Sequence, residues 1–140
     1  MIVTGAIVPL SQPRIPMNHM RAANSSVQLI AAERQYATRS TRSAATGFTC
    51  DLRQLAQAGL VDTVLGSGDK AGYLYELHGC NTTGTASLFF FTAVPIAQDR
   101  TGKFAFCANQ EGVLWFAGGG STDECFRARA RWTRSSDGWR

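Results

Sequence analysis

The four cysteines are the residues of this 140-residue chain best suited to do chemistry. Cys50, Cys80, Cys107 and Cys125 lie far apart and form no C-x-x-C pair, whereas zinc sites usually present closely spaced ligands. We therefore expect no metal and no cofactor. An even number of dispersed cysteines in a small, glycine-rich chain favours two disulfides, and three pairings are open. Disulfides would place the folded part in the periplasm or outside the cell; four reduced, buried cysteines in a cytosolic protein are the alternative.

Groups that could catalyse a reaction are few. His19 and His78 have no acid or hydroxyl partner in a triad pattern. The glycine-rich run at 118–122 lacks the lysine and the spacing of a phosphate-binding loop. Asp123 and Glu124 form an acidic pair without the spacing of a calcium loop. The sequence therefore predicts that the protein is not an enzyme.

The basic residues offer a second kind of chemistry. The formal net charge is +4, and arginines gather with aromatic residues at residues 127–140. The candidate anion-binding residues are Arg127, Arg129, Arg131 and Arg134. Alternate arginines on a strand would share one face, and neighbouring tryptophans could stack on bases. A DNA-binding or anionic-ligand-binding module is thus the alternative function, and a solvated tail is the alternative interpretation of these residues.

The elements that must position these groups begin with a long helix. The length fits one domain, and apolar residues recur at helical spacing over residues 20–42. Val27, Leu29 and Ile30 are predicted to be buried against a sheet, and Ser25 and Ser26 are interpreted as helix surface. Residues 1–10 are apolar but too few to span a bilayer, and Pro9, Pro13 and Pro16 predict an interruption of any helix there.

The rest of the chain alternates between short elements and turns. A second helix is predicted over 49–58, capped by Thr49 or Asp51 and ended by Gly59. After it the hydrophobic period changes to two, and strands are predicted over 72–78, 86–94, 104–108 and 113–116. A loose loop with Cys125 follows. This order predicts an α+β fold with a long N-terminal helix on a three- to four-stranded antiparallel meander.

Three pieces of the chain, in order, resemble the globular head of type IV pilin-like proteins, the pilins and pseudopilins of bacterial filaments. They are AANSSVQLIAAERQYA at 22–37, GFTCDLRQLAQAGLVDTVLGSGDKAGYLYEL at 47–77 and FFFTAVPIAQDRTGKFAFCANQEGVLWF at 89–116. In that family an N-terminal helix starts in the membrane and continues into the head, where the sheet packs across it. The family's basic leader and unbroken hydrophobic stretch do not appear in these 140 residues.

The resemblance implies a structural subunit of a type IV pilus or a type II secretion pseudopilus. Its partners would be copies of itself or other pilins, together with the inner membrane through an N-terminal helix that is missing or truncated here. The subunit would be anchored in the inner membrane before assembly and would lie in a filament at the cell surface afterwards. The residues expected to form the assembly helix are Ala22, Ser26, Val27, Leu29, Ile30 and Tyr36.

Within this scheme the chain divides into three parts. Residues 1–19 are expected to be the remnant of the hydrophobic segment, 20–126 the pilin-like domain and 127–140 a basic, aromatic tail. Two local disulfides are favoured, Cys50–Cys80 and Cys107–Cys125, because each would link an element to the next turn or strand. Closing the loop between Cys50 and Cys80 would contribute on the order of 3 kcal/mol.

Overall fold

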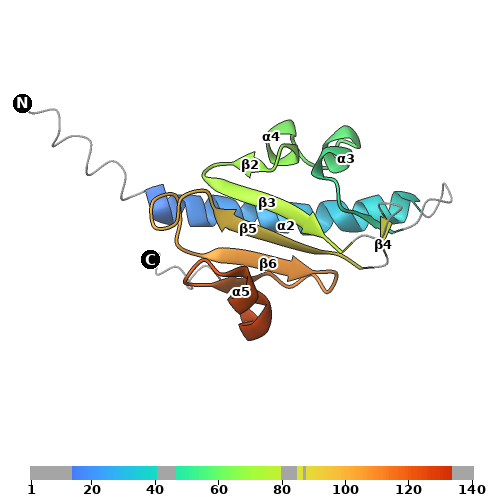
Figure 1. The fold of residues 1–140 in the computed structure, drawn as a ribbon. Coiled ribbons are helices and arrows are strands. Elements are labelled where there is room, and N and C mark those ends of the chain that lie inside the picture. The colour runs from blue at the N-terminus through green and yellow to red at the C-terminus, as the bar shows by residue number, and fades with distance from the viewer. Residues whose placement is uncertain (1–13, 41–46, 80–84, 87, 134–140) are drawn as a thin grey trace, which may run out of the picture.

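A long N-terminal helix, α2 (Arg14–Ser40), runs along one side of the molecule in the computed structural model (Figure 1). The structure describes residues 14–40, 47–79, 85–86 and 88–133. The described part of the helix starts at Arg14, ahead of the predicted residue 20, and it includes Pro16. The prediction that Pro16 interrupts the helix is therefore wrong.

The sheet has six antiparallel strands in the order β2-β3-β5-β6-β7-β8. Its strands are β2 (Asp69–Lys70), β3 (Tyr73–His78), β5 (Phe90–Pro95), β6 (Ala105–Asn109), β7 (Trp115–Ala117) and β8 (Ala130–Arg131). The α+β class and the antiparallel meander are confirmed. The strand count exceeds the predicted three or four because the two-residue strands β2 and β8 extend the edges, and so short a strand has no detectable period.

The predicted strand over 86–94 is two elements. β4 (Thr85–Ala86) pairs with β1 (Phe48–Thr49) in a separate two-stranded sheet, whereas β5 starts at Phe90 in the main sheet. The β-branched and aromatic run at 86–94 gives one continuous signal, and side-chain period alone does not show which partner strand each half will find.

Two short helices cover one edge of the sheet. α3 (Leu52–Gln57) is capped by Asp51, whose side chain accepts a hydrogen bond from the Arg53 backbone N–H. α4 (Thr63–Gly66) is capped in the same way by Asp62. These bonds satisfy amides that have no partner within a helix. Of the two predicted caps for the first of these helices, Asp51 is the correct one, and Thr49 belongs to β1 instead.

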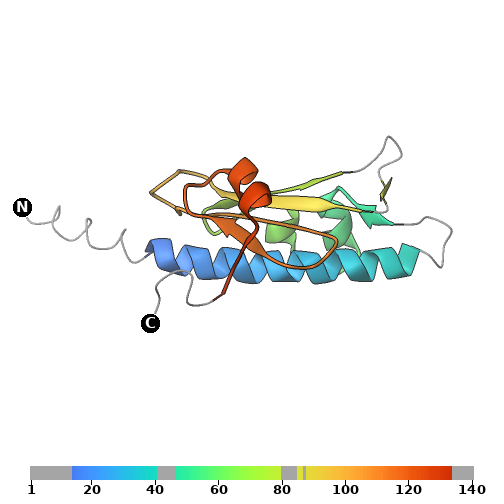
Figure 2. The same cartoon turned by 90° about the horizontal axis from the view of Figure 1, so that it is seen from below.

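The sheet lies between helices on its two faces (Figure 2). α2 packs against one face, and α5 (Thr122–Ala128) lies on the other, over β6 and β7. The loop predicted to follow residue 120 is thus a helix. Ser121 caps it by accepting from the Glu124 N–H, and the Ser-x-x-Glu spacing of a capping box was the sequence signal that could have revealed it.

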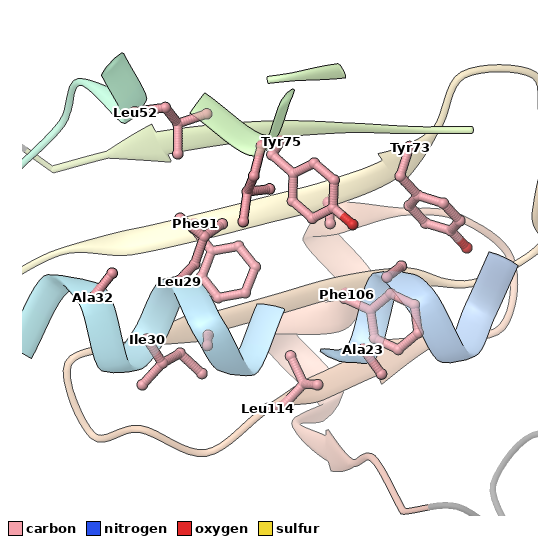
Figure 3. Close-up of a cluster of buried hydrophobic side chains, with 14 of the residues drawn as sticks. Ala23, Leu29, Ile30, Ala32, Leu52, Tyr73, Tyr75, Phe91, Phe106 and Leu114 are labelled. Atoms are coloured by element: carbon pink, nitrogen blue, oxygen red, sulfur yellow. The ribbon is translucent and has the colours of Figure 1, made fainter. Parts of the chain in front are cut away.

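The main core fills the space between α2 and the sheet. Leu29, Ile30 and Ala23 from the helix meet aromatic side chains of the strands, and Figure 3 shows Phe91 and Phe106 directed toward them. Fully buried in this core are Leu29, Leu55, Leu65, Tyr73, Phe89, Phe91 and Phe106. Tyr73 satisfies its hydroxyl by donating to the Phe104 carbonyl at 2.7 Å. Aromatic side chains therefore supply most of the volume over which α2 lies.

Candidate functional site: the two faces of α2 and the covered outer face of the sheet

The six residues predicted to form an assembly surface divide between the two faces of α2. Ala22, Ser26, Leu29 and Ile30 are buried against the chain's own sheet, and Tyr36 is partly buried there. Only Val27 faces outward, with 56% of its surface exposed. The prediction that Val27 is buried is wrong, and those for Leu29 and Ile30 are confirmed. The helical spacing identified an apolar side, but its width did not show where that side ends.

The outward face of α2 is polar, small and cationic. Besides Val27, its exposed residues are Arg14, Met17, Arg21, Asn24, Gln28, Ala31, Arg34, Gln35, Thr38 and Arg39. The single acidic residue in the helix, Glu33, is on the buried side. This face has few apolar side chains, and its exposed charged residues are all basic. It therefore suits close contact at its small residues and attraction to acidic partners at its arginines.

Glu33 is the most unusual buried group between α2 and the sheet. Its Oε1 accepts a hydrogen bond from the Thr49 backbone N–H at 2.9 Å, whereas its Oε2 is buried with no hydrogen-bond partner. Burial raises the pKa of Glu33 to about 7, and the Thr49 hydrogen bond opposes that rise. The sequence analysis did not single out Glu33. Its position four residues after Leu29, on the apolar side of the helix, was the available signal.

Three other polar groups on the buried side of α2 have structural partners. His19 Nε2 accepts from the Lys103 backbone N–H at 2.8 Å, and the ring stacks on Phe104. Ser26 donates to the Ala22 carbonyl at 2.7 Å, and Ser25 hydrogen-bonds Tyr75, whose pKa burial raises to about 12. The interpretation of Ser25 and Ser26 as helix surface is therefore wrong. Both face a sheet whose tyrosines need polar neighbours.

A disulfide joins α5 to the outer face of the sheet. Cys107 of β6 bonds to Cys125 of α5, with Cα atoms 6.2 Å apart, which confirms this predicted pair. Trp115, Ala117 and the half-buried Phe126 complete a small second core around it. Cys50 is also disulfide-bonded. Its predicted partner, Cys80, lies outside the described residues, so that pairing stays a prediction.

The C-terminal arginines do not form a common face. Arg127 lies in the last turn of α5 and pairs with Glu124, whereas Arg129 is the left-handed C-cap of that helix and lies 4.8 Å over the Trp115 ring. Only Arg131 is in a strand, and Arg134 lies outside the described residues. The predicted alternation of 127, 129 and 131 along one strand is therefore wrong, since a helix end intervenes.

The expected tail is also structured in part. Residues 127–133 complete α5 and add β8, and Trp132 packs on Phe104, Phe106 and Phe116. The Trp132 backbone N–H donates to the Leu114 carbonyl at 2.9 Å. The sequence analysis considered the arginines and did not predict that Trp132 packs this segment against the main core.

His78 has an acidic and a hydroxyl neighbour on the outer face of the sheet. Its Nε2 lies 3.6 Å from Glu76 Oε1 and 3.2 Å from Thr92 Oγ1; the Glu76 side chain is exposed and that of His78 partly exposed, whereas Thr92 is buried. Across the described part of the chain, no three histidine, cysteine, aspartate or glutamate side chains gather in a way that could hold a metal ion. Among the described helices, none combines the length and the hydropathy that a bilayer span requires.

Comparisons of the chain with protein-family models, curated proteins and solved structures gave no significant match.

Proposed function

We propose that this chain is a pilin-like subunit of an extracellular filament of the type IV pilus or type II secretion pseudopilus kind. The observation that carries the proposal is α2: a 27-residue helix that buries one side against an antiparallel meander and leaves the other side exposed along its length. A subunit that stacks through a helix needs this division. One face must hold its own head, and the other must be free for neighbours.

The exposed side of α2 has the composition that close helix contact requires. Ala31 and Val27 are small to medium in size and lie within the middle of the helix, where Asn24 and Gln28 can hydrogen-bond across an interface. Small residues allow two helix backbones to approach, and polar residues of this type fix their register. Filament contact along this strip is the mechanism that we assign to the helix.

The head has the reinforcement expected of a domain outside the cell. Cys107–Cys125 holds the outer helix α5, and Cys50 is in a second disulfide. Such bonds persist in the periplasm and outside the cell, where a filament subunit would lie, whereas thiols in the cytosol are kept reduced. Before assembly the subunit would be anchored at the inner membrane.

The proposal is tested in the organism that makes the protein. Cysteine is introduced at Val27 or Ala31, and a short bismaleimide is added to intact cells. We expect covalent dimers and higher multimers of the chain, and filaments labelled by its antibody in the fraction sheared from the cell surface. The control is Thr63→Cys on α4, an exposed position away from α2.

The control should give far fewer multimers, since α4 is not part of the proposed contact. Monomers alone from both α2 variants, with the chain missing from the sheared fraction, would contradict a filament role. Equal multimers from α2 and α4 would contradict the assignment of the contact to the helix.

A further inference from the structure

A depression of about 1000 Å³ lies at the N-terminal end of α2 and is not used by the filament contact above. The first turns of the helix form one wall, and two turns of the sheet form the other: the turn between β2 and β3 at residues 71–72 and the loop between β5 and β6 at residues 97–101. Figure 1 shows both turns beside this end of α2. Three segments distant in the sequence thus build one concave surface.

Specific contacts hold these walls together. Asn18 on the helix donates from its side-chain amide to the Thr101 carbonyl at 2.9 Å. Gly72 has a φ of +86°, and a Cβ there would meet Asn18 and Thr101 at 3.0 Å. Ala71 and Asp99, with φ values of 51° and 67°, also line the depression in the left-handed region. The shape is therefore fixed by packing and by the backbone.

The charge in the depression is positive. Arg14 and Arg21 from α2 and Arg100 from the β5–β6 loop line it, and Asp99 is the single acidic residue among them. All three arginines are exposed, and none forms an ion pair with another described residue. A guanidinium group binds a phosphate through two parallel hydrogen bonds, and three such groups around one hollow favour an anion with several oxygens.

Apolar side chains accompany this charge. Met17 lines the depression and is 44% exposed, and Ile96, next to the lining residue Ala97, is 47% exposed. Aliphatic groups beside arginines suit a membrane interface, where the former reach the acyl boundary and the latter the headgroups. Among the described residues that line the depression none is aromatic, so these residues offer the bases of a nucleic acid no stacking surface.

We propose that this depression binds the phosphate groups of anionic phospholipids at a membrane surface. Arg14, Arg21 and Arg100 would contact headgroup oxygens, while Met17 and Ile96 enter the interface. Such binding would turn the N-terminal end of α2 toward the membrane. It goes beyond the filament role, which concerns the middle of the helix and contact with other subunits, and its test does not depend on filament formation.

The test measures binding of the purified full chain to vesicles by flotation. Vesicles of phosphatidylglycerol and phosphatidylcholine are compared with vesicles of phosphatidylcholine alone. A basic residue near an anionic membrane contributes about 1 kcal/mol, or about fivefold in affinity. The triple variant Arg14→Gln, Arg21→Gln, Arg100→Gln should therefore lose on the order of 100-fold in affinity for the anionic vesicles.

The matched control removes the same charge elsewhere. Arg39→Gln, Arg53→Gln, Arg127→Gln changes three arginines that do not line the depression, and it should keep most of the affinity. The single variant Met17→Ser should bind the anionic vesicles more weakly than the parent chain does. Equal affinity of the triple variant and its control would overturn the proposal, since only net charge would then matter.

Two further measurements distinguish lipid phosphate from inorganic phosphate and from the phosphates of DNA. Protection of the chain by inorganic phosphate against thermal unfolding, with no preference for anionic vesicles, would overturn the lipid assignment. So would tight binding of a short DNA duplex that the triple variant loses while vesicle binding stays unchanged. Preference for anionic vesicles that disappears with the three arginines is the expected result.

Discussion

The two faces of the sheet are covered in different ways. α2 covers the inner face with 27 residues and a continuous aromatic core, and it contains no cysteine that could bond it to the strands it lies on. α5 covers part of the outer face with seven residues and a core of four buried residues, two of which are the disulfide-bonded cysteines. A helix of two turns buries too little apolar area to stay in place unaided, so the covalent bond compensates for the missing area.

The two helices that cover the sheet should also differ in how far the effect of a mutation spreads. The inner cover must remain docked while its other face meets partners, and its stability comes from a large buried surface. The outer cover leaves outward side chains of β3 and the first residue of β5 exposed, with Leu74 42% and Phe90 36% exposed. Changes to α2 should therefore affect the whole head, whereas changes to α5 should act locally.

The largest effect is expected from a charge placed under α2. Leu29→Asp or Ile30→Asp should abolish cooperative folding, because each site is buried and a carboxylate there would have no partner. Val27→Asp is the matched control on the same helix: its site is 56% exposed, and the free energy of unfolding should change by less than about 0.5 kcal/mol. Circular dichroism during denaturation measures both. A cooperatively folded Ile30→Asp variant would contradict the packing of α2.

Removal of the disulfide should have the next largest effect, confined to the outer cover. The double variant Cys107→Ala, Cys125→Ala should lower the free energy of unfolding by about 3 kcal/mol, since the bond closes a segment of 18 residues. Hydrogen exchange should become fast in α5 while amides of α2 stay protected. Arg127→Ala removes an exposed ion pair from the same helix and should change stability by less than about 1 kcal/mol. Unchanged protection of α5 in the double variant would show that its packing suffices.

Glu33, buried between α2 and the sheet, should make the stability of the inner cover depend on pH. Its pKa of about 7 in the folded state exceeds the ordinary value of 4.5, so folding favours the protonated form. The contribution of Glu33 to stability should therefore be largest below pH 4.5, fall by about 3 kcal/mol as the pH rises toward 7, and level off above it.

Glu33→Gln should remove most of this dependence and stabilise the head by about 2 kcal/mol at pH 8, less than the full amount because its amide N–H groups would lack acceptors. Chemical denaturation between pH 4 and 8 measures the change. The control, Glu111→Gln, alters an exposed side chain and should keep the parent's pH profile. A flat profile in the parent chain would show that Glu33 is not titrating in the core.

The sequence was informative where elements are long or strongly periodic. Helical spacing around Leu29 and Ile30 located α2, and the period of two at 73–78 located β3, because an element with one buried face has apolar residues at regular intervals in the sequence. Two-residue strands leave none, so β8 was missed. The turn of Arg129 into the left-handed region, which separates α5 from β8, depends on packing over Trp115 rather than on its residue type. The arginine-lined depression joins three distant segments, and their proximity follows only from the assembled sheet.

The smallest effect is expected at Ala71, in the turn against which the start of α2 packs. Ala71 and Gly72 both have positive φ, the backbone of a type I′ hairpin turn between β2 and β3. Asparagine tolerates this conformation better than alanine, so Ala71→Asn should stabilise the head by about 0.5 kcal/mol. The same change at Ala31, exposed in α2, should destabilise it by a similar amount through helix propensity. Denaturation midpoints compare the two variants. Destabilisation by Ala71→Asn would show that the side chain, not the backbone, limits this turn, and that the wall of the depression is packed more tightly than its exposure indicates.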